Sequence, residues 1–332
     1  MYKFYVGVDT SKKTIDVSWT DGPKPSYLNH FANTIPGFKK MIVALSKHTS
    51  VQESEWFICF ENTGTYSKAL LYWLLSQGIP CLEENAMKIY FKKGMSRGKN
   101  DRIDSEIICD YAFTNRDRLV PSTLAKPEII ALKKLLSQRE LLVKNKKAIA
   151  VSLKEHKSEF SPKLFEQLEH QNQLLIIQFQ VNIEKVEDLI RDIIKSKEAL
   201  TKNDNLAQSV VGVGPIISWY MIAYTDNFST VKDSRKFANY IGIAPHPYQS
   251  GISIKRKDKT SKMANQQVKA IVSNGIISAI RYDPQIRAYY YRKIEEGKPE
   301  GLVYNNIKNK LVTRVFSTIH RGTPYVKLNN YV

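Results

Sequence analysis

Hydrophobic residues in the first 120 positions follow two different spacings along the chain. Alternating or short apolar runs predict five strands, over residues 2–8, 14–20, 27–33, 55–61 and 79–82. Apolar residues three and four apart predict helices after Pro36 and over residues 67–77 and 101–115. The order is therefore three strands, followed by helix, strand, helix, strand and helix.

This order of elements resembles the RNase H-like or RuvC-like fold, which contains a mixed sheet. In that fold the first and fourth strands are parallel neighbours at the centre of the sheet. Asp9 ends the first predicted strand and Glu61 ends the fourth. Side chains alternate along a strand, and both acids fall on matching faces, so we expect them to emerge side by side.

Two long helical patterns occupy the middle of the chain, over residues 126–157 and 163–200. The second has apolar residues at intervals close to a heptad, at Leu168, Leu175, Phe179, Val186, Leu189 and Ile193. These patterns predict a helical hairpin. The long seam favours a coiled coil that joins two copies of the chain, and the alternative is a hairpin packed on the protein's own core.

The last part of the chain, from about residue 206, predicts a mainly helical domain, with helices over 235–241, 263–281 and 302–320. The predicted fold class is thus α/β plus all-α. We predict three domains: 1–122 with the mixed sheet, 123–203 with the helical hairpin, and 204–332 at the C-terminus.

Composition narrows the class of protein. The 332 residues are 42% hydrophobic and 25% charged, as in soluble globular proteins. No apolar run is long enough for a membrane span, and the N-terminus enters a strand without a signal peptide. The three cysteines lack CxxC spacing, which favours buried, reduced thiols in the cytoplasm over disulfides or a zinc site.

The net charge of +18 favours a polyanionic partner, and the alternative is a protein that is basic only for solubility. The charge is uneven along the sequence. From His246 onwards there are 16 Lys and Arg against 5 Asp and Glu, so this quarter of the chain is strongly basic. Nucleic acid is therefore the expected partner.

Four acids carry the clearest chemical signal: Asp9, Glu61, Asp101 and Asp104. Carboxylates at strand ends are costly to bury unless a cation compensates, and hard oxygen ligands suit Mg²⁺ or Mn²⁺. Asp101 and Asp104 are three residues apart, so one helix face can bring both to the same place. The alternatives are that Asp101 caps its helix and that Asp104 balances Arg102. Other acids nearby, which we do not assign to the site, are Asp16, Glu83, Glu84 and Asp110.

Basic residues precede the second pair of acids. Between residues 88 and 102 they are Lys88, Lys92, Lys93, Arg97, Lys99 and Arg102. Tyr90 and Phe91 lie among them, a composition suited to phosphate contacts and base stacking, although a solvated loop can look the same. Residues 287–292 combine arginines and tyrosines in a similar way, and some of these tyrosines are expected to belong to the core.

Two short motifs in the last domain have open interpretations. The glycines in 210–215 can shape a hairpin that holds a phosphate on backbone N–H groups, or simply a tight turn. Ser250-Gly251 is an ordinary turn dipeptide, and a catalytic serine would need a base, a metal or cationic stabilisation of its target. Basic candidates for nucleic-acid contact in this region are His246, Lys255, Arg256, Lys257, Lys259 and Lys262.

Several of these segments together resemble the insertion-sequence transposases of the IS110 type. The matching segments are Val6-Gly7-Val8-Asp9, Phe60-Glu61-Asn62-Thr63-Gly64, Lys99-Asn100-Asp101-Arg102-Ile103-Asp104, Gly212-Val213-Gly214-Pro215, and Phe237 to Pro245 followed by Ser250-Gly251. They occur in the family's order over nearly the whole chain. Two glycines of the family's basic loop are replaced here, by Asp258 and Ala264, and His246 stands where Arg is common.

The resemblance implies a DEDD recombinase with a RuvC-like domain and a C-terminal transposase domain. Its four acids fall on Asp9, Glu61, Asp101 and Asp104, and its nucleophilic serine on Ser250. It further implies donor and target DNA as substrates, a structured non-coding bridge RNA as guide, and dimers that assemble into a tetramer. In that assembly the acids of one subunit face the serine of another. The expected location is the prokaryotic cytoplasm, in association with the nucleoid.

Two other functions stay open from the sequence. A metal-dependent endonuclease of the RuvC kind would use the four acids and water, without the serine. A non-catalytic protein that binds RNA or DNA would keep the fold and its basic surface alone.

Overall fold

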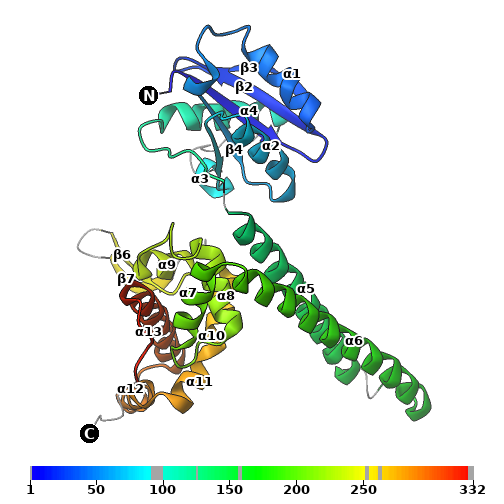
Figure 1. Cartoon of the computed structure of the whole chain (residues 1–332), viewed down its shortest axis with the longest axis vertical. Coiled ribbons are helices and arrows are strands. Elements are labelled where there is room, and N and C mark those ends of the chain that lie inside the picture. The colour runs from blue at the N-terminus through cyan, green and yellow to red at the C-terminus, as the bar shows by residue number, and fades with distance from the viewer. Residues whose placement is uncertain are drawn as a thin grey trace. The chain divides into compact units, whose positions relative to one another are not determined.

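The structure is a computed structural model that describes residues 2–90, 100–124, 126–155, 159–250, 254–260 and 264–327. For residues 153, 154, 246–250 and 254–259 it describes the backbone alone. The chain divides into two compact units, Met1–Leu124 and Ala125–Val332 (Figure 1).

The N-terminal unit contains a five-stranded sheet in the order β3-β2-β1-β4-β5. The strands are β1 (Phe4–Thr10), β2 (Thr14–Thr20), β3 (Ser26–Ala32), β4 (Trp56–Glu61) and β5 (Cys81–Glu84). β1 pairs antiparallel with β2 and parallel with β4, β2 pairs antiparallel with β3, and β4 pairs parallel with β5. The predicted mixed sheet is confirmed, with its first and fourth strands as parallel neighbours, which is consistent with a RuvC-like domain.

Helices cover both faces of this sheet. They are α1 (Ile35–Leu45), α2 (Thr65–Ser76), α3 (Ala86–Tyr90) and α4 (Asp101–Thr114), with one 3₁₀ turn, η1 (Glu53–Glu55). On one face, Val6 and Val8 of β1 and Ile58 of β4 pack with α1 and α2 in the larger core. On the other face, Tyr5 and Cys59 pack with α4 in a smaller core. The period-two alternation of both strands thus separates two hydrophobic layers.

Helix α4 lies directly on β1 because the strand has a glycine at the point of contact. A Cβ added to Gly7 would lie 2.2 Å from the backbone N of Cys109 and 2.3 Å from the carbonyl O of Ser105. The hydroxyls of Ser18 and Ser105 share a buried hydrogen bond of 2.7 Å, which ties β2 to the same helix. Small residues on both sides therefore determine how closely α4 approaches the sheet.

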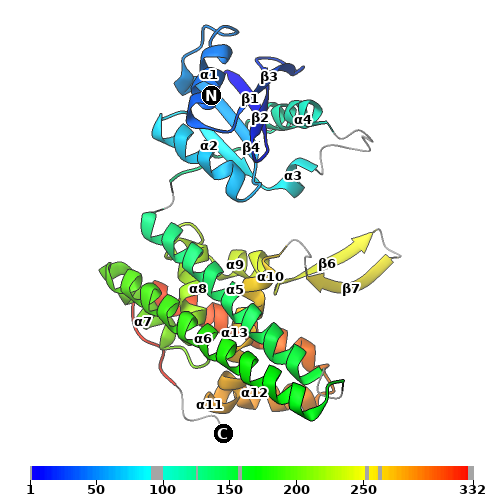
Figure 2. The same ribbon diagram turned by 90° about the vertical axis from the view of Figure 1, so that its right-hand side faces the viewer.

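The C-terminal unit begins with two long helices, α5 (Pro127–Glu155) and α6 (Pro162–Lys195), which run side by side as a hairpin (Figures 1 and 2). Contacts between the two helices include an ion pair of 2.7 Å between Arg139 and Glu187. The elements that follow are α7 (Glu198–Gln208), α8 (Pro215–Thr225), α9 (Ser234–Tyr240), β6 (Pro245–Ser250), β7 (Ile254–Thr260), α10 (Gln266–Ser273), α11 (Gly275–Tyr282), α12 (Pro284–Glu295) and α13 (Glu300–Arg321).

The base of the hairpin shares its hydrophobic core with these later helices. Leu132 and Leu136 of α5 and Ile190 of α6 are buried in one cluster with α8 and α13. Two residues of the predicted seam on α6, Leu175 and Leu189, are about half exposed in the single chain, and the coiled coil between two copies stays a prediction. The buried positions of α6 are Ile183, Ile190 and Ile194, since α5 covers that face.

Two other expectations for this unit are corrected. The single helix predicted over 263–281 is interrupted at Asn274 and forms α10 and α11. The interruption lies where another loop crosses, since a Cβ on Gly275 would lie 2.2 Å from the carbonyl O of Gly212. The hairpin of β6 and β7 was not predicted, because its run of basic residues hides the alternation typical of strands.

Two further features predicted from the sequence can be compared with the structure. Cys59, Cys81 and Cys109 are all buried free thiols, as predicted. In the part of the chain that the structure describes, no helix is both long and apolar enough to cross a membrane.

Gly7→Ala should destabilise the N-terminal unit by about 1–3 kcal/mol, the usual cost of forcing extra volume into a packed contact. Three of the four tryptophans, Trp19, Trp56 and Trp73, lie in this unit, so urea unfolding followed by fluorescence reports on it. The matched control is Gly22→Ala, because nothing lies within 4 Å of a Cβ at that position. Equal stability of the two variants would contradict the close contact of α4 with β1.

Candidate active site

The ends of β1 and β4 bring the first two predicted acids together. The parallel register pairs Val8 with Phe60, so Asp9 and Glu61 follow at neighbouring positions. Asp9 lies on the face of the sheet that α4 covers. Gly7 lies on the same face, as the alternation of side chains along the strand predicted. The sequence prediction that these acids emerge side by side therefore agrees with the strand register.

A short hydrogen-bonded turn holds these two strand ends. The hydroxyls of Thr10 and Thr63 share a hydrogen bond of 2.8 Å, which joins the residues beyond Asp9 and Glu61. The side chain of Asn62 accepts from the N–H of Gly64 at 3.0 Å. Gly64 has φ of +73°, a conformation that favours glycine, and it leads directly into α2. The motif Glu61 to Gly64 is thus a turn that fixes where the Glu61 backbone ends.

The second pair of acids lies in the first turn of α4. Asn100 caps this helix, because its side chain accepts from the N–H of Arg102 at 3.1 Å. Asp101 is therefore not needed as the cap. Arg102 pairs through Nε with Glu106 at 3.2 Å, a partner other than the one considered from the sequence. Carboxylates in a first turn also interact favourably with the helix dipole.

The electrostatics of Asp9 indicate that all four acids converge. Burial, the largest cause, and the nearby charges of Asp104, Asp101 and Glu61 together raise the pKa of the Asp9 carboxyl from 3.8 to about 6. Coulombic effects of this kind require carboxylates within a short range of one another. The four residues identified from the sequence are therefore neighbours in the N-terminal unit.

A fifth carboxylate, Asp16, joins this group, although the sequence reading set it aside. The register of β1 and β2 places Asp16 opposite Asp9, and its charge also raises the pKa of Asp9. Asp16 accepts a hydrogen bond of 2.8 Å from the Tyr27 hydroxyl. The Arg102 guanidinium lies over the Tyr27 ring, 5.1 Å from its centroid. The cross-strand register identifies Asp16 as a neighbour of Asp9, and alternation within one strand does not.

The neighbouring acids of β5 have structural partners. Glu84 is buried and accepts a hydrogen bond of 2.9 Å from the hydroxyl of Tyr111. Glu83 accepts from the hydroxyl of Ser67 at 2.7 Å and pairs with Lys68. Both acids therefore anchor helices to the sheet, as expected for residues outside the site.

The donor set suits a hard divalent cation. It consists of carboxylate oxygens, which are the ligands that Mg²⁺ and Mn²⁺ prefer. Burial and the neighbouring negative charges both raise the pKa of Asp9, and a cation would offset both effects. Within the described residues, no three His, Cys, Asp or Glu side chains already form a group that could hold a metal ion. Like charges repel without a cation, so the four side chains must move closer together to ligate one.

The predicted basic residues are only partly described. Lys88, on α3, pairs with Glu84 at 3.0 Å. The residues that lie outside the described part of the chain are Lys92, Lys93, Arg97, Lys99 and Lys262. His246 lies on β6, opposite Lys259 of β7.

Ser250 is the last residue of β6, where it pairs with Ile254 of β7. The same short hairpin contains Lys255, Arg256, Lys257 and Lys259 within β7. The serine is thus at the end of a strand of a strongly basic β-hairpin in the C-terminal unit.

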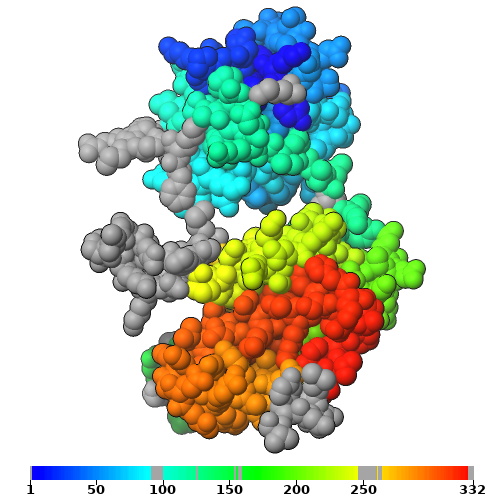
Figure 3. Space-filling view, turned by 90° about the vertical axis from the view of Figure 1, so that its left-hand side faces the viewer, coloured from blue at the N-terminus to red at the C-terminus, as the bar shows by residue number. Residues whose placement is uncertain are grey.

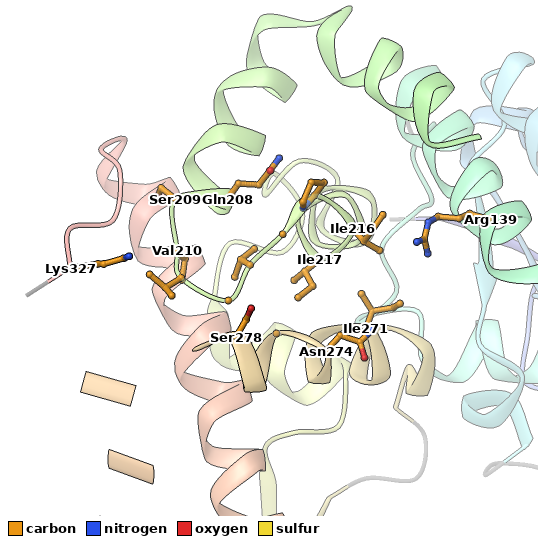
Figure 4. Close-up of a pocket in the computed structure, with 16 residues that line it drawn as sticks. Arg139, Gln208, Ser209, Val210, Ile216, Ile217, Ile271, Asn274, Ser278 and Lys327 are labelled. Atoms are coloured by element: carbon orange, nitrogen blue, oxygen red, sulfur yellow. The ribbon is translucent and has the colours of Figure 1, made fainter. Parts of the chain in front are cut away.

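The glycine motif at 210–215 forms the loop between α7 and α8, beside a cavity of 630 Å³ (Figure 4). Val213 donates to the carbonyl of Val210 at 2.9 Å, and Gly212 has φ of +93°. Arg139 and Lys327 line opposite ends of this cavity. Close packing of Gly212 on Gly275 accounts for the first glycine, and phosphate binding at this loop stays a prediction.

Comparison with known proteins identifies the family. Residues 6–162 match the family of DEDD transposases of the IS110 type, described as "Transposase". Residues 204–291 match "Transposase IS116/IS110/IS902 family". The first match runs from the N-terminal unit into the helical hairpin, the second lies in the C-terminal unit, and together they cover most of the chain. The chain belongs to the IS110 family of transposases, and it is an enzyme that acts on DNA.

Curated relatives resemble the chain over its length. It is 23% identical over 339 residues to the pilin gene-inverting protein of Moraxella bovis, covering 98% of this chain and 99% of the relative. The pilin gene-inverting protein of Moraxella lacunata is 23% identical over 345 residues, with the same coverage. A putative transposase of Sinorhizobium fredii is 23% identical over 262 residues, covering 70% of this chain and 66% of the relative.

The pKa of Asp9 predicts a pH-dependent stability. Because the folded protein holds a proton that the unfolded chain releases between pH 3.8 and about 6, the metal-free protein loses stability as the pH rises through about 6. In EDTA, Asp9→Asn should therefore melt at a higher temperature than the unmodified chain near about pH 8, and this gain should shrink near about pH 5. Thermal unfolding followed by tryptophan fluorescence measures both.

Asp21→Asn is the matched control, since Asp21 is an exposed acid in the turn between β2 and β3. It should show no gain that depends on pH. If Asp9→Asn melts at the same temperature as the unmodified chain at both pH values, the carboxylates do not converge on Asp9.

Proposed function

We propose that the chain is a DNA recombinase of an insertion sequence, guided by a structured non-coding RNA, that exchanges strands through a serine nucleophile and a metal site. The observation that carries this proposal is that Glu61, Asp101 and Asp104 all lie close enough to partly buried Asp9 to raise its pKa. Membership of a transposase family supplies DNA as the substrate. The acids alone would also suit a nuclease.

In this proposal Asp9, Glu61, Asp101 and Asp104 hold Mg²⁺ or Mn²⁺. The bound ion supplies positive charge that orients and polarises a scissile phosphate. The carboxylates provide ligands from two strand ends and one helix terminus; the Gly7 contact holds α4 on β1, and parallel pairing holds β4 beside β1. Rigid elements of this kind are suited to holding a metal in fixed geometry.

Ser250 is the proposed nucleophile. Its Oγ forms a bond to phosphorus, one P–O bond of the DNA backbone breaks, and the leaving sugar oxygen takes up a proton. A hydroxyl of a second strand then attacks the phosphoserine, which restores the serine and completes the exchange without ATP. The family resemblance of Ser250-Gly251 and the basic character of the β6–β7 hairpin support this role.

The names of the relatives favour joining of DNA over cutting alone. Two of them are named as gene-inverting proteins, and inversion of a gene requires that broken strands be rejoined. A water-driven endonuclease of the RuvC kind is the second candidate, because it needs only the acids. A non-catalytic RNA- or DNA-binding protein is the third, and retention of all four acids argues against it.

A guide RNA and the assembly state complete the proposal. The net charge of +18 suits a protein that holds both donor and target DNA together with RNA. Such an enzyme would work in the prokaryotic cytoplasm, beside the nucleoid. An exposed apolar stripe on the helical hairpin supports a dimer or tetramer. It consists of Leu174, Ile177 and Val181, which lie at helical spacing on α6.

Strand exchange on a DNA substrate with the cognate guide RNA tests the chemistry. Asp9→Asn and Asp104→Asn should each reduce the rate by at least about 100-fold, because ligands of a catalytic metal are lost. Ser250→Ala should abolish both exchange and the covalent protein–DNA adduct that is trapped by denaturation in detergent. Ser196→Ala and Asp21→Asn should retain activity.

The adduct separates the candidates. Cleavage by the Ser250→Ala variant at the normal rate, with no adduct in the unmodified enzyme, would replace the serine step by hydrolysis. Metal binding that is unchanged in Asp9→Asn, together with absence of any strand cleavage, would favour the non-catalytic protein.

The exposed stripe predicts self-association. Replacing both Leu174 and Ile177 by Gln should convert a dimer or tetramer to a monomer, because it removes the apolar surface available to a second hairpin. Sedimentation velocity measures the change, and Leu189→Gln, at a half-exposed position nearer the base of the hairpin, is the control. An unmodified chain that sediments as a monomer at micromolar concentration would contradict the proposal.

A further inference from the structure

We propose that a groove on the C-terminal unit binds unpaired bases of single-stranded DNA. The groove lies among α11, α12 and α13, has a volume of 430 Å³, and falls in the size range of ligand pockets. We call it the tyrosine–arginine groove, and it is formed by Ile277, Arg281, Arg287, Tyr290, Tyr291 and Tyr304. Figure 3 shows these helices, coloured orange to red, as one continuous part of the surface.

The tyrosines of the groove form a preorganised aromatic surface. Tyr290 and Tyr304 are stacked, with ring centroids 5.9 Å apart and an interplanar angle of 10°. Their hydroxyls both donate to the same oxygen of Glu300, at 2.8 and 2.6 Å, which holds the two rings in place. Tyr291 packs edge-on to Tyr290 and remains 56% exposed. A base that stacks on Tyr291 therefore meets a ring whose neighbours are already ordered.

The arginines supply positive charge beside these rings. Arg287 is held in place because its Nε donates to the carbonyl of Ile280 at 3.2 Å and another guanidinium nitrogen donates to the carbonyl of Arg281. Arg281 is exposed at the edge of the groove. The residues that line the groove include no acid. Ring faces for bases and guanidinium groups for phosphates are the two components of a site for single strands.

Charge distinguishes nucleic acid from a second copy of the chain as the occupant. Residues 275–327 contain 10 Lys and Arg against 4 Asp and Glu, and the whole chain carries +18, so two copies would repel at this surface. A polyanion is complementary to it. The exposed side chain of Ile277, at 61%, adds an apolar wall that suits the face of a base better than a backbone phosphate.

An unpaired strand fits the groove better than a duplex. Bases in a duplex are stacked on one another, so an aromatic ring reaches a base face only when the base is unpaired. Exchange of DNA strands passes through unpaired segments, and we assign the occupant to DNA on that basis. This assignment depends on the family's action on DNA and not on the serine or the metal.

Binding of a fluorescent single-stranded oligodeoxynucleotide to the full-length protein, in EDTA, tests the proposal by anisotropy. Tyr291→Ala should weaken this binding by about tenfold, the lower part of the range for loss of one base–aromatic stack. Tyr291→Phe should restore it to within about twofold, because the ring is kept. Arg281→Ala should lower the slope of log affinity against log salt by about 1.

Leu302→Ala and Lys298→Ala are matched controls, since both remove exposed side chains on the same unit that do not line the groove. They should bind single strands normally. A 2-aminopurine base in the oligonucleotide gives a second readout, because stacking on Tyr291 should quench its fluorescence in the unmodified protein and not in Tyr291→Ala.

Two outcomes overturn the proposal. Duplex DNA of the same sequence should bind Tyr291→Ala as well as the unmodified chain, and an equal loss for both forms would mean a general phosphate surface. A loss for RNA of the same sequence without a loss for DNA would assign the groove to RNA. Because the assay contains no metal, failure of strand exchange in Asp9→Asn or Ser250→Ala has no bearing on it.

Discussion

The candidate site depends on how closely helix α4 approaches strand β1. Gly7 has no side chain, so the helix backbone at Ser105 and Cys109 lies against the strand itself. Asp101 and Asp104 begin this helix, and Asp9 ends this strand. This single close contact between backbones thus places Asp101 and Asp104 near Asp9. The parallel pairing of β1 with β4 places Glu61 there as well.

This arrangement concentrates negative charge in a chain that is otherwise strongly basic. Burial and the charges of the neighbouring acids together raise the pKa of Asp9, so both oppose its ionised form. A divalent ion would offset the negative charge of the acids, and the net charge of the whole chain would still favour DNA. Asp16, bonded to Tyr27, adds to the same charge from the neighbouring strand. Stability of the metal-free protein and affinity for a cation are therefore opposed.

Much of the N-terminal unit could be predicted from the sequence because its strands alternate cleanly and its helices have regular apolar spacing. The same reasoning paired Asp9 with Glu61 correctly. It set aside Asp16, because cross-strand register is not visible in a single strand. It joined α10 to α11, because the crossing of Gly212 over Gly275 is a tertiary contact. The spacing of apolar residues on α6 did not distinguish positions that α5 and the core cover, such as Val186 and Ile193, from exposed ones such as Leu175 and Leu189.

Diffraction from crystals of the protein soaked in Mn²⁺, recorded where manganese scatters anomalously, tests the central claim most directly. The account predicts an anomalous peak about 2.1 Å from carboxylate oxygens of Asp9 and of at least two among Glu61, Asp101 and Asp104. A peak found only at a different site would contradict this claim. Carboxylates that remain apart at saturating Mn²⁺, with no peak among them, would contradict it too.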